Sequence, residues 1–338
     1  MNIYKIAKMA GVSIATVSRV INNNPSVKQE TREKVKAVLR EIEYLPNHIA
    51  RSLATNETKT IGVLTTNVRD SYYAAAIYTI EQELKRFGYN VILCNTGTEL
   101  KDKREYLKIL LQKKVDGIIL VGSVFKEKDN NSHIYNAAAS VPIVMLNSFL
   151  PGENVYSVVC DDGYGVARAV EWLYEKGHRN IVYLYDVLSF AGISKLEGFR
   201  ESMASLGLSI HPFGIVRVEQ SIAGGYRGVE ILDQYEIPFT ALIASEDIIA
   251  AGAMKKLVEM GRSVPRDVVV FGHNNSNVSL CTNPELSSID SKVETIAVLA
   301  ARTLFRVLNN KEASTKTVIV PELVVRGSSS ADVCNVTS

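Results

Sequence analysis

The sequence of 338 residues predicts a small all-α module followed by a larger α/β core, built as two lobes with parallel sheets and helices on both faces. Two observations lead to this fold class. The first 46 residues carry apolar residues at helical spacing and no convincing strand. From residue 61, short β-rich runs alternate with amphipathic helical stretches over some 260 residues. This alternation indicates parallel strands joined by crossover helices, and it is too long for one simple doubly wound sheet.

The all-α module is expected to hold three short helices. Apolar residues between positions 6 and 10 fit the first helix, and Gly11 interrupts it because glycine readily adopts positive φ. Ser13 can cap a second helix, in which apolar residues recur three and four positions apart. A further apolar stripe begins near residue 29, and Pro46 ends it.

The turn at Gly11 leaves one face of the second helix open. A helix-turn-helix presents this face to the major groove of DNA, where Arg19 can read a guanine edge and the hydroxyl groups of Thr16 and Ser18 suit phosphates or bases. Residues 1–60 hold 10 Lys/Arg against 5 Asp/Glu, and this basic excess favours a polyanionic partner. The residues expected to contact DNA are Ile14, Ala15, Thr16, Ser18, Arg19 and Asn22.

The core follows a short connecting segment. Residues 47–55 have helical propensity but are too few for a helix that is stable alone, and residues 56–60 are polar and linker-like. The expected strands are residues 61–65, 91–94, 117–121, 143–146, 181–185, 241–244 and 268–271. The expected helices are residues 74–87, 101–113, 165–176, 196–206, 223–235 and 248–260. Glycines stand where several of these helices would end.

Two motifs identify a family resemblance. The segment AKMAGVSIATVSRVIN spans residues 7–22, and ARSLA spans residues 50–54. With them, residues 3–60 resemble the DNA-binding head of the LacI/GalR family of bacterial transcriptional regulators. The remainder, to about Gly327, resembles the two-lobed, periplasmic-binding-protein-like core of that family. Further similar segments are residues 31–35, 44–47, 115–119, 177–178, 198–199, 252–254 and 270–272.

The resemblance implies a domain organisation and a function. The implied parts are a helix-turn-helix domain at 1–46, a hinge helix and linker at 47–60, an effector-binding and dimerisation core at 61–327, and a tail at 328–338. The first lobe of the core is expected at 61–160 with 292–320, and the second at 161–291 with 321–327. The implied protein is a cytoplasmic homodimer that represses transcription from a pseudo-palindromic operator. A small molecule, a sugar or related metabolite, is expected to control it.

The hinge is implied to fold only when two copies meet on DNA. Leu53 is then the apolar wedge that enters a base step from the minor groove and kinks it. Ala50 is small enough for the two hinge helices and the DNA to approach closely. The resemblance adds Asn47 and Arg51 to the implied DNA contacts.

In the cleft between the lobes, the implied effector contacts are Tyr72, Tyr73, Asn147, Asp161, Lys195, Glu246 and Asn274. Three of them depart from the pattern common among sugar-binding members. Lys195 stands where an arginine is usual, Glu246 where asparagine or threonine is usual, and Asn274 where aspartate is usual. An unpaired lysine favours an anionic effector. If Glu246 neutralises it, an uncharged sugar or glycoside is favoured, and nucleoside-like or protein effectors are further alternatives.

Several classes are not supported by the sequence. It contains no P-loop, HExxH or Gly-x-Ser-x-Gly motif, so we expect no enzyme, cofactor or metal site. The four cysteines form no CxxC pair, which favours reduced thiols in a cytosolic protein. No run approaches the roughly 18 apolar residues that span a membrane. A solute-binding receptor of the same core fold, without a regulatory DNA role, is the alternative; it would need a secretory signal and would not need the ARSLA segment.

Overall fold

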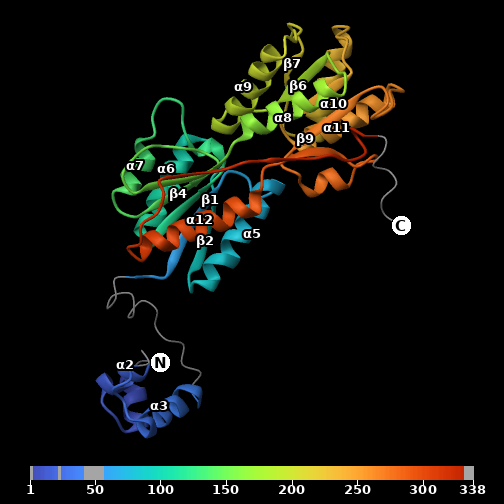
Figure 1. Ribbon diagram of the computed structural model, residues 1–338. Coiled ribbons are helices and arrows are strands. Elements are labelled where there is room, and N and C mark those ends of the chain that lie inside the picture. The colour runs from blue at the N-terminus through green and yellow to red at the C-terminus, as the bar shows by residue number, and fades with distance from the viewer. Residues whose placement is uncertain (1–2, 22–23, 42–56, 331–338) are drawn as a thin grey trace. The chain divides into compact units, whose positions relative to one another are not determined.

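The computed structural model describes residues 3–21, 24–41 and 57–330. The chain divides into two compact units, residues 1–58 and 59–338 (Figure 1). Among the described residues, no helix is long and apolar enough to cross a lipid bilayer.

The first unit is a three-helix module. Its helices are α1 (Ile3–Ala10), α2 (Ile14–Ile21) and α3 (Gln29–Glu41). Gly11 forms the turn between α1 and α2 with a φ of 64°. Ser13 begins α2, because its hydroxyl oxygen accepts a hydrogen bond from the backbone N–H of Thr16 at 3.1 Å. The small core of this unit contains Ile6, Ala7, Val17, Val20 and Val35.

The second unit contains two sheets with helices on both faces of each. The first lobe has a parallel sheet in the order β11-β5-β4-β3-β1-β2. Its strands are β1 (Thr60–Thr65), β2 (Asn90–Asn95), β3 (Gly117–Val121), β4 (Ile143–Leu146), β5 (Val155–Cys160) and β11 (Lys316–Ile319). Helices α5 (Ser71–Arg86) and α12 (Val293–Leu308) pack on one face, and α6 (Leu100–Gln112) and α7 (Ser132–Ala138) on the other.

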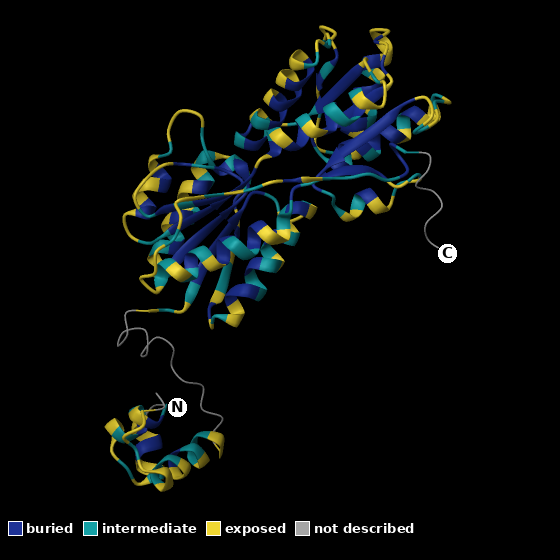
Figure 2. Cartoon of the chain, viewed as in Figure 1, coloured by how far each residue is buried: buried dark blue, intermediate teal, exposed yellow. Residues whose placement is uncertain are grey.

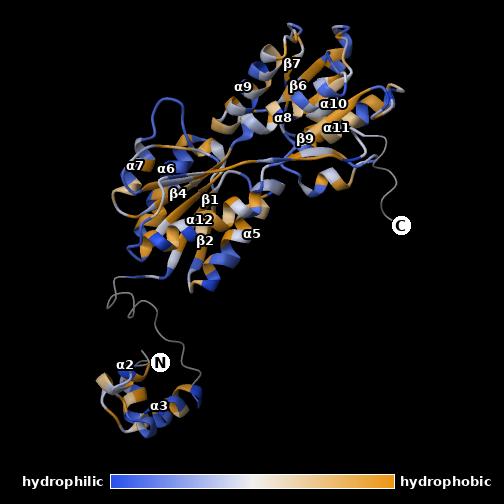
Figure 3. Cartoon of the chain, in the orientation of Figure 1, coloured by the Kyte–Doolittle hydropathy of each residue, from blue (hydrophilic) through white to orange (hydrophobic). Residues whose placement is uncertain are grey.

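The second lobe has the sheet order β12-β10-β9-β8-β6-β7, in which only the β10–β12 pair is antiparallel. Its strands are β6 (Ile181–Tyr185), β7 (Ile215–Arg217), β8 (Ala241–Ala244), β9 (Val269–His273), β10 (Ser287–Asp290) and β12 (Glu322–Val324). Helices α8 (Asp162–Glu175) and α9 (Phe190–Ser205) cover one face, and α10 (Ile222–Gln234) and α11 (Asp247–Glu259) the other. The strands of both lobes are largely buried and hydrophobic (Figures 2 and 3).

Three segments connect the lobes: the step from β5 to α8, the step from β10 to α12, and the step from β11 to β12. Each lobe is therefore completed by residues from the C-terminal part of the chain. Because the strands of a parallel sheet end at the same edge, the loops that follow them gather on one side of each lobe.

The structure extends the expected elements in several places. Strands β5, β7, β10, β11 and β12 and helices α7 and α12 were not among the expected ones. Helix α5 begins at Ser71 rather than at residue 74, because Asp70 caps it. The second unit begins at Lys59, whose backbone N–H donates to the Asp116 carboxylate at 2.7 Å. Ser328 and Ser329, which were expected in the tail, are buried against the second lobe.

Candidate functional site

The expected DNA-contacting residues of α2 lie on the face turned away from the core of the first unit. The exposed ones are Ile14, Ala15 and Arg19, and the partly exposed ones are Thr16 and Ser18. The opposite face is buried through Val17 and Val20. A helix packed along one face and accessible along the other has the geometry that major-groove reading requires.

The remaining expected DNA contacts, Asn22, Asn47, Ala50, Arg51 and Leu53, lie outside the described residues, as does the expected hinge helix. They stay predictions.

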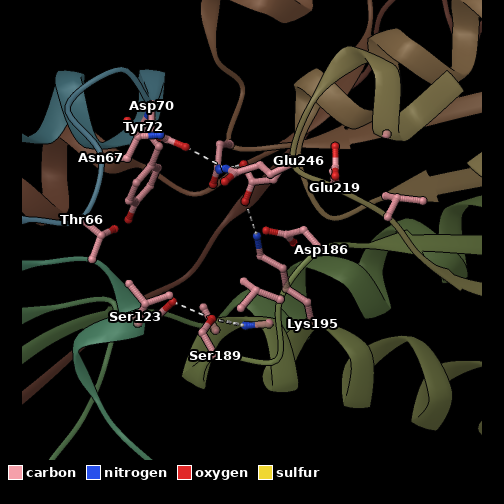
Figure 4. A pocket seen from close by; sticks show the side chains of 18 of the residues that line it. Thr66, Asn67, Asp70, Tyr72, Ser123, Asp186, Ser189, Lys195, Glu219 and Glu246 are labelled. Atoms are coloured by element: carbon pink, nitrogen blue, oxygen red, sulfur yellow. Dashed lines mark hydrogen bonds and ion pairs between the residues drawn. The ribbon is translucent and has the colours of Figure 1, made fainter. Parts of the chain in front are cut away.

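A cavity of about 720 Å³ lies between the two lobes of the second unit (Figure 4). This volume is in the range of roughly 300–1,000 Å³ that is usual for small-molecule sites. Most of its polar side chains come from the loops and first helical turns that follow the carboxyl ends of the strands, where α/β proteins bind ligands. Six of the seven expected effector contacts line it: Tyr72, Tyr73, Asn147, Lys195, Glu246 and Asn274.

Lys195, on α9, is only 6% exposed, and its ammonium group points at Glu246 (Figure 4). Its Nζ donates to Oε1 of Glu246 at 3.2 Å and to the backbone oxygen of Ser245 at 2.8 Å. The other carboxylate oxygen of Glu246 accepts from Nδ2 of Asn274, whose own side-chain oxygen accepts from the hydroxyl of Ser291. The three residues that depart from the sugar-binding pattern therefore form one hydrogen-bonded group.

The charges of this group are set by burial and by neighbouring acids. Burial opposes the ammonium of Lys195, but Glu246 and Asp162 outweigh it and hold the pKa of Lys195 above its usual range. Burial raises the pKa of Glu246 to about 8, although Lys195 lowers it, and Asp186 adds to the rise. Lys195 is thus a charged group already surrounded by acids, and it is not an unpaired anion receptor.

Asp70 connects the tyrosines of the cavity to the opposite lobe. Its Oδ1 accepts from the backbone N–H groups of Tyr72 and Tyr73, at 2.9 and 3.1 Å, and so caps α5. Its Oδ2 accepts from Nε2 of Gln220, in the second lobe, at 2.7 Å. The buried hydroxyl of Tyr72 has no hydrogen-bond partner among the described residues. Tyr72 lines the cavity, but its hydroxyl oxygen is itself buried.

Asn147 links the cavity to a buried network. Its backbone has a φ of 54°, a conformation that asparagine tolerates better than most residues. Its Nδ2 donates to Oδ2 of Asp162 at 2.9 Å, and Nε2 of His273 contacts Oδ1 of Asp162 at 3.0 Å. Burial lowers the pKa of His273 to about 4, so the imidazole is neutral and Nε2–H donates to the carboxylate. The network fixes the end of β4 against the start of α8.

The structure does not bring Asp161 to the cavity. Asp161 is exposed and caps α8 by accepting from the backbone N–H of Tyr164 at 3.1 Å. It lines a separate groove between α8 and α9. Successive helical residues point about 100° apart, so the next residue, Asp162, is the one turned into the interior.

Comparison with known proteins gives the family. Residues 2–47 match the profile of bacterial regulatory proteins of the lacI family, and residues 170–329 match a periplasmic binding protein-like domain. An HTH-type transcriptional regulator of Lachnoclostridium phytofermentans is 42% identical over 328 residues, covering 96% of this chain and 98% of that protein. The chain belongs to the LacI family of bacterial regulatory proteins.

Other members of the family are similar over nearly the whole length. Catabolite control protein A of Priestia megaterium is 31% identical over 329 residues, covering 96% of this chain and 97% of the relative. The lac repressor dimer bound to operator and the anti-inducer ONPF has the same fold, with a TM-score of 0.88, 24% identity and coverage of 97% and 98% of the two chains. A complex of the transcriptional regulator CelR with cellobiose has a TM-score of 0.72, 27% identity and coverage of 97% and 99%.

The expected family, fold class and regulatory role are confirmed. This LacI-family protein is a DNA-binding transcriptional regulator and not an enzyme. The alternative of a receptor without a regulatory DNA role fails, because residues 2–47 match the family of bacterial regulators rather than an unrelated extension.

Sequence reasoning missed several residues that line the cavity of this LacI-family regulator. Asp186, Arg217 and Glu219 lie at or just after the ends of β6 and β7. Asn67 follows β1, and Ser123 follows β3. Their position beyond strand ends is a signal that could have identified them, but β7 has only three residues and was not recognised as a strand.

Proposed function

We propose that this LacI-family regulator represses transcription in the cytoplasm as a homodimer on a pseudo-palindromic operator. A small polar molecule that binds between the lobes of the core, residues 59–330, controls it. The first unit supplies one reading helix per subunit, so two subunits present two α2 helices to two half-sites. The accessible face of α2 with Arg19 supports this reading role.

The observation that carries the effector assignment is the contact between Lys195 and Glu246 within the cavity. Because the lysine is already paired, a phosphate or carboxylate would have to displace Glu246 and approach Asp186. Hydroxyl groups of a ligand can instead donate to Asp186, and to Glu246 when it is ionised, and they can accept from Nδ2 of Asn274. We therefore favour an uncharged, hydroxyl-rich effector, such as a sugar or glycoside. The cellobiose complex of CelR is a structural precedent at 27% identity.

Control by the effector follows from linkage. A ligand shifts the balance between two arrangements of the lobes only by as much as its affinities for them differ. Residues of both lobes line the cavity, so lobe rotation changes the site itself. The same rotation would alter the separation of the two heads on DNA.

The test begins with selection of duplexes from a random pool by the full-length protein, followed by anisotropy titration of the best sequence. We expect a site with two-fold sequence symmetry and one dimer bound per duplex. A thermal-shift screen of sugars, glycosides, sugar phosphates and nucleosides then supplies effector candidates, which are added to the operator titration. An asymmetric site bound by one subunit would contradict the dimeric reading. Stabilisation by sugar phosphates but not by neutral sugars would contradict the effector class.

A further inference from the structure

A short segment beside the cavity bridges the two lobes. This segment, residues 122–127, follows β3 and is called the bridge segment here. The hydroxyls of Ser123 and Ser189 share a hydrogen bond of 2.8 Å, and each residue is only 9% exposed (Figure 4). Ser189 caps α9 in the second lobe. One residue further along in that lobe, the ring of Phe190 lies 4.6 Å from Nζ of Lys126.

The bridge segment is held from within the first lobe by a buried lysine. The side chain of Lys103, on α6, is 3% exposed. Its Nζ donates to the backbone oxygen of Val124 at 2.6 Å and to Oε1 of Glu127 at 2.8 Å. An ammonium group is buried at high cost unless it is paired and hydrogen-bonded, and here both partners belong to the bridge segment.

The bridge segment also meets the cavity directly. Ser123 and Val124 line it, whereas Lys103 does not. Gly122 has a φ of 123°, and a Cβ there would lie 2.8 Å from the ring of Tyr73, so the backbone passes close beneath this tyrosine. The conformation that Lys103 imposes is therefore passed both to the cavity wall and to the Ser123–Ser189 bond.

We propose that Lys103 is a positioning residue that stabilises the arrangement of the lobes in which Ser123 and Ser189 meet and, through it, effector affinity, without touching the effector. The effector part of this inference rests on the proposed function of the cavity. The part that concerns the contact between the lobes does not rest on it, because that contact forms between residues of the chain itself. A purely structural role of Lys103 within the first lobe would leave the contact between the lobes unchanged.

The experiment measures how often Ser123 and Ser189 meet. In the full-length protein, Ser123→Cys and Ser189→Cys are combined with Cys281→Ser and Cys334→Ser. Cys94 and Cys160 are kept, because both are buried and poorly accessible to the oxidant. Without effector, oxidised glutathione accepts the electrons and protons of the two thiols as the disulfide forms. Non-reducing gels separate the cross-link within one chain from a cross-link between chains. The rate of disulfide formation is then compared among three proteins: one that keeps Lys103 and Glu127, one with Lys103→Met and one with Glu127→Gln.

We expect rapid cross-linking within the chain when Lys103 is present. One hydrogen bond to a charged group shifts an equilibrium by roughly tenfold, so Lys103→Met should slow the reaction about tenfold and Glu127→Gln about threefold. Lys256→Met is the matched control, because it breaks a lysine–carboxylate contact of 3.1 Å between α11 and α10. This control should leave the rate unchanged, and circular dichroism confirms that each variant is folded.

Three outcomes overturn the inference or part of it. Failure to cross-link with Lys103 present would exclude the bridge. Equal rates with Lys103, Lys103→Met and Glu127→Gln would exclude positioning by Lys103. If the rate falls but the affinity for a ligand from the thermal-shift screen does not, the bridge stands and its coupling to effector affinity is excluded, since a ligand that selects the bridged arrangement must bind less tightly when that arrangement is rarer.

Discussion

Replacing Glu246 by Gln tests the charge state of the cavity. The carboxylate lies in a buried cluster with Lys195 and Asp186, and burial raises its pKa to about 8 from the ordinary value of 4.5. The folded protein therefore binds a proton at Glu246 that the unfolded chain releases at lower pH. Because the folded state binds more protons, this group makes the free energy of unfolding decrease as the pH rises from 4.5 through 8. Glu246→Gln removes this contribution.

The size of the effect follows from the two pKa values. Between pH 6 and pH 8, titration of a folded-state group with a pKa of about 8 lowers the free energy of unfolding by about 2 kcal/mol. His273 and His133 act in the opposite direction, because burial lowers the pKa of each to about 4. Their contribution to the free energy of unfolding therefore increases with pH until the pH passes the pKa of about 6.5 that they have in the unfolded chain. The difference between wild type and Glu246→Gln cancels these histidine contributions.

Urea unfolding at pH 6 and pH 8, at one protein concentration, measures the difference. Trp172 is the only tryptophan in the sequence and lies edge-on to Phe271 in the second lobe, so its fluorescence reports the lobe that contains Glu246. Between pH 6 and pH 8, the free energy of unfolding of the wild type should fall by about 2 kcal/mol more than that of Glu246→Gln. Glu230→Gln, in a partly exposed pair with Lys256, is the control and should behave as wild type. Equal pH dependence in wild type and Glu246→Gln would refute the raised pKa.

Further predictions concern both units. Arg19→Ala should weaken binding to the selected operator by roughly 1–3 kcal/mol, with less effect on binding to random DNA. Equal losses of affinity for the two DNAs, measured by anisotropy, would rule out base reading by Arg19. Deletion of residues 1–58 should leave a folded dimer that binds effector but not DNA; a monomer in light scattering would show that the dimer contacts lie elsewhere. Leu53→Ala should reduce DNA bending and affinity together, and an unchanged bend in gel assays would count against a wedge. Lys195→Met should weaken binding of a neutral sugar in calorimetry, so unchanged affinity would remove Lys195 from the site.

Much of the core was predictable because its central strands are continuous apolar runs. Strands such as β3 and β4 are buried along their whole length, so nearly every residue in them is hydrophobic. The cavity lies beside their carboxyl ends, and the family resemblance supplied Asn147 and Asn274, which line it. Asp161, supplied by the same resemblance, does not line the cavity. A strand end locates a site to within a residue or two, but the first helical turn decides which of two neighbouring aspartates faces inward.

The missed strands are short, or belong to segments whose partners are distant in sequence. β11 alternates between exposed and half-buried residues, and it pairs with β5 about 160 positions earlier. β12 is three residues long and has no fully buried residue. Such strands are defined by the edge that they join and not by their own hydrophobicity. The same holds for Lys103, since nothing in the pattern of α6 distinguishes it from a surface lysine; only the fold places its ammonium group beneath the bridge segment.

The arrangement around Lys195 shows why the identity of single residues does not by itself predict the charge of an effector. Taken singly, a lysine where an arginine is usual suggests an anion. In the fold, Glu246 and Asn274 lie beside it and form a group whose hydrogen bonds are directed at one another. Adding a ligand carboxylate would place a further negative charge near Asp186 in a site shielded from water, where like charges repel strongly. Adding a hydroxyl group brings a donor for these carboxylates without a new charge. For this reason we propose that the three residues act together in binding hydroxyl groups and do not mark a change in the charge of the ligand.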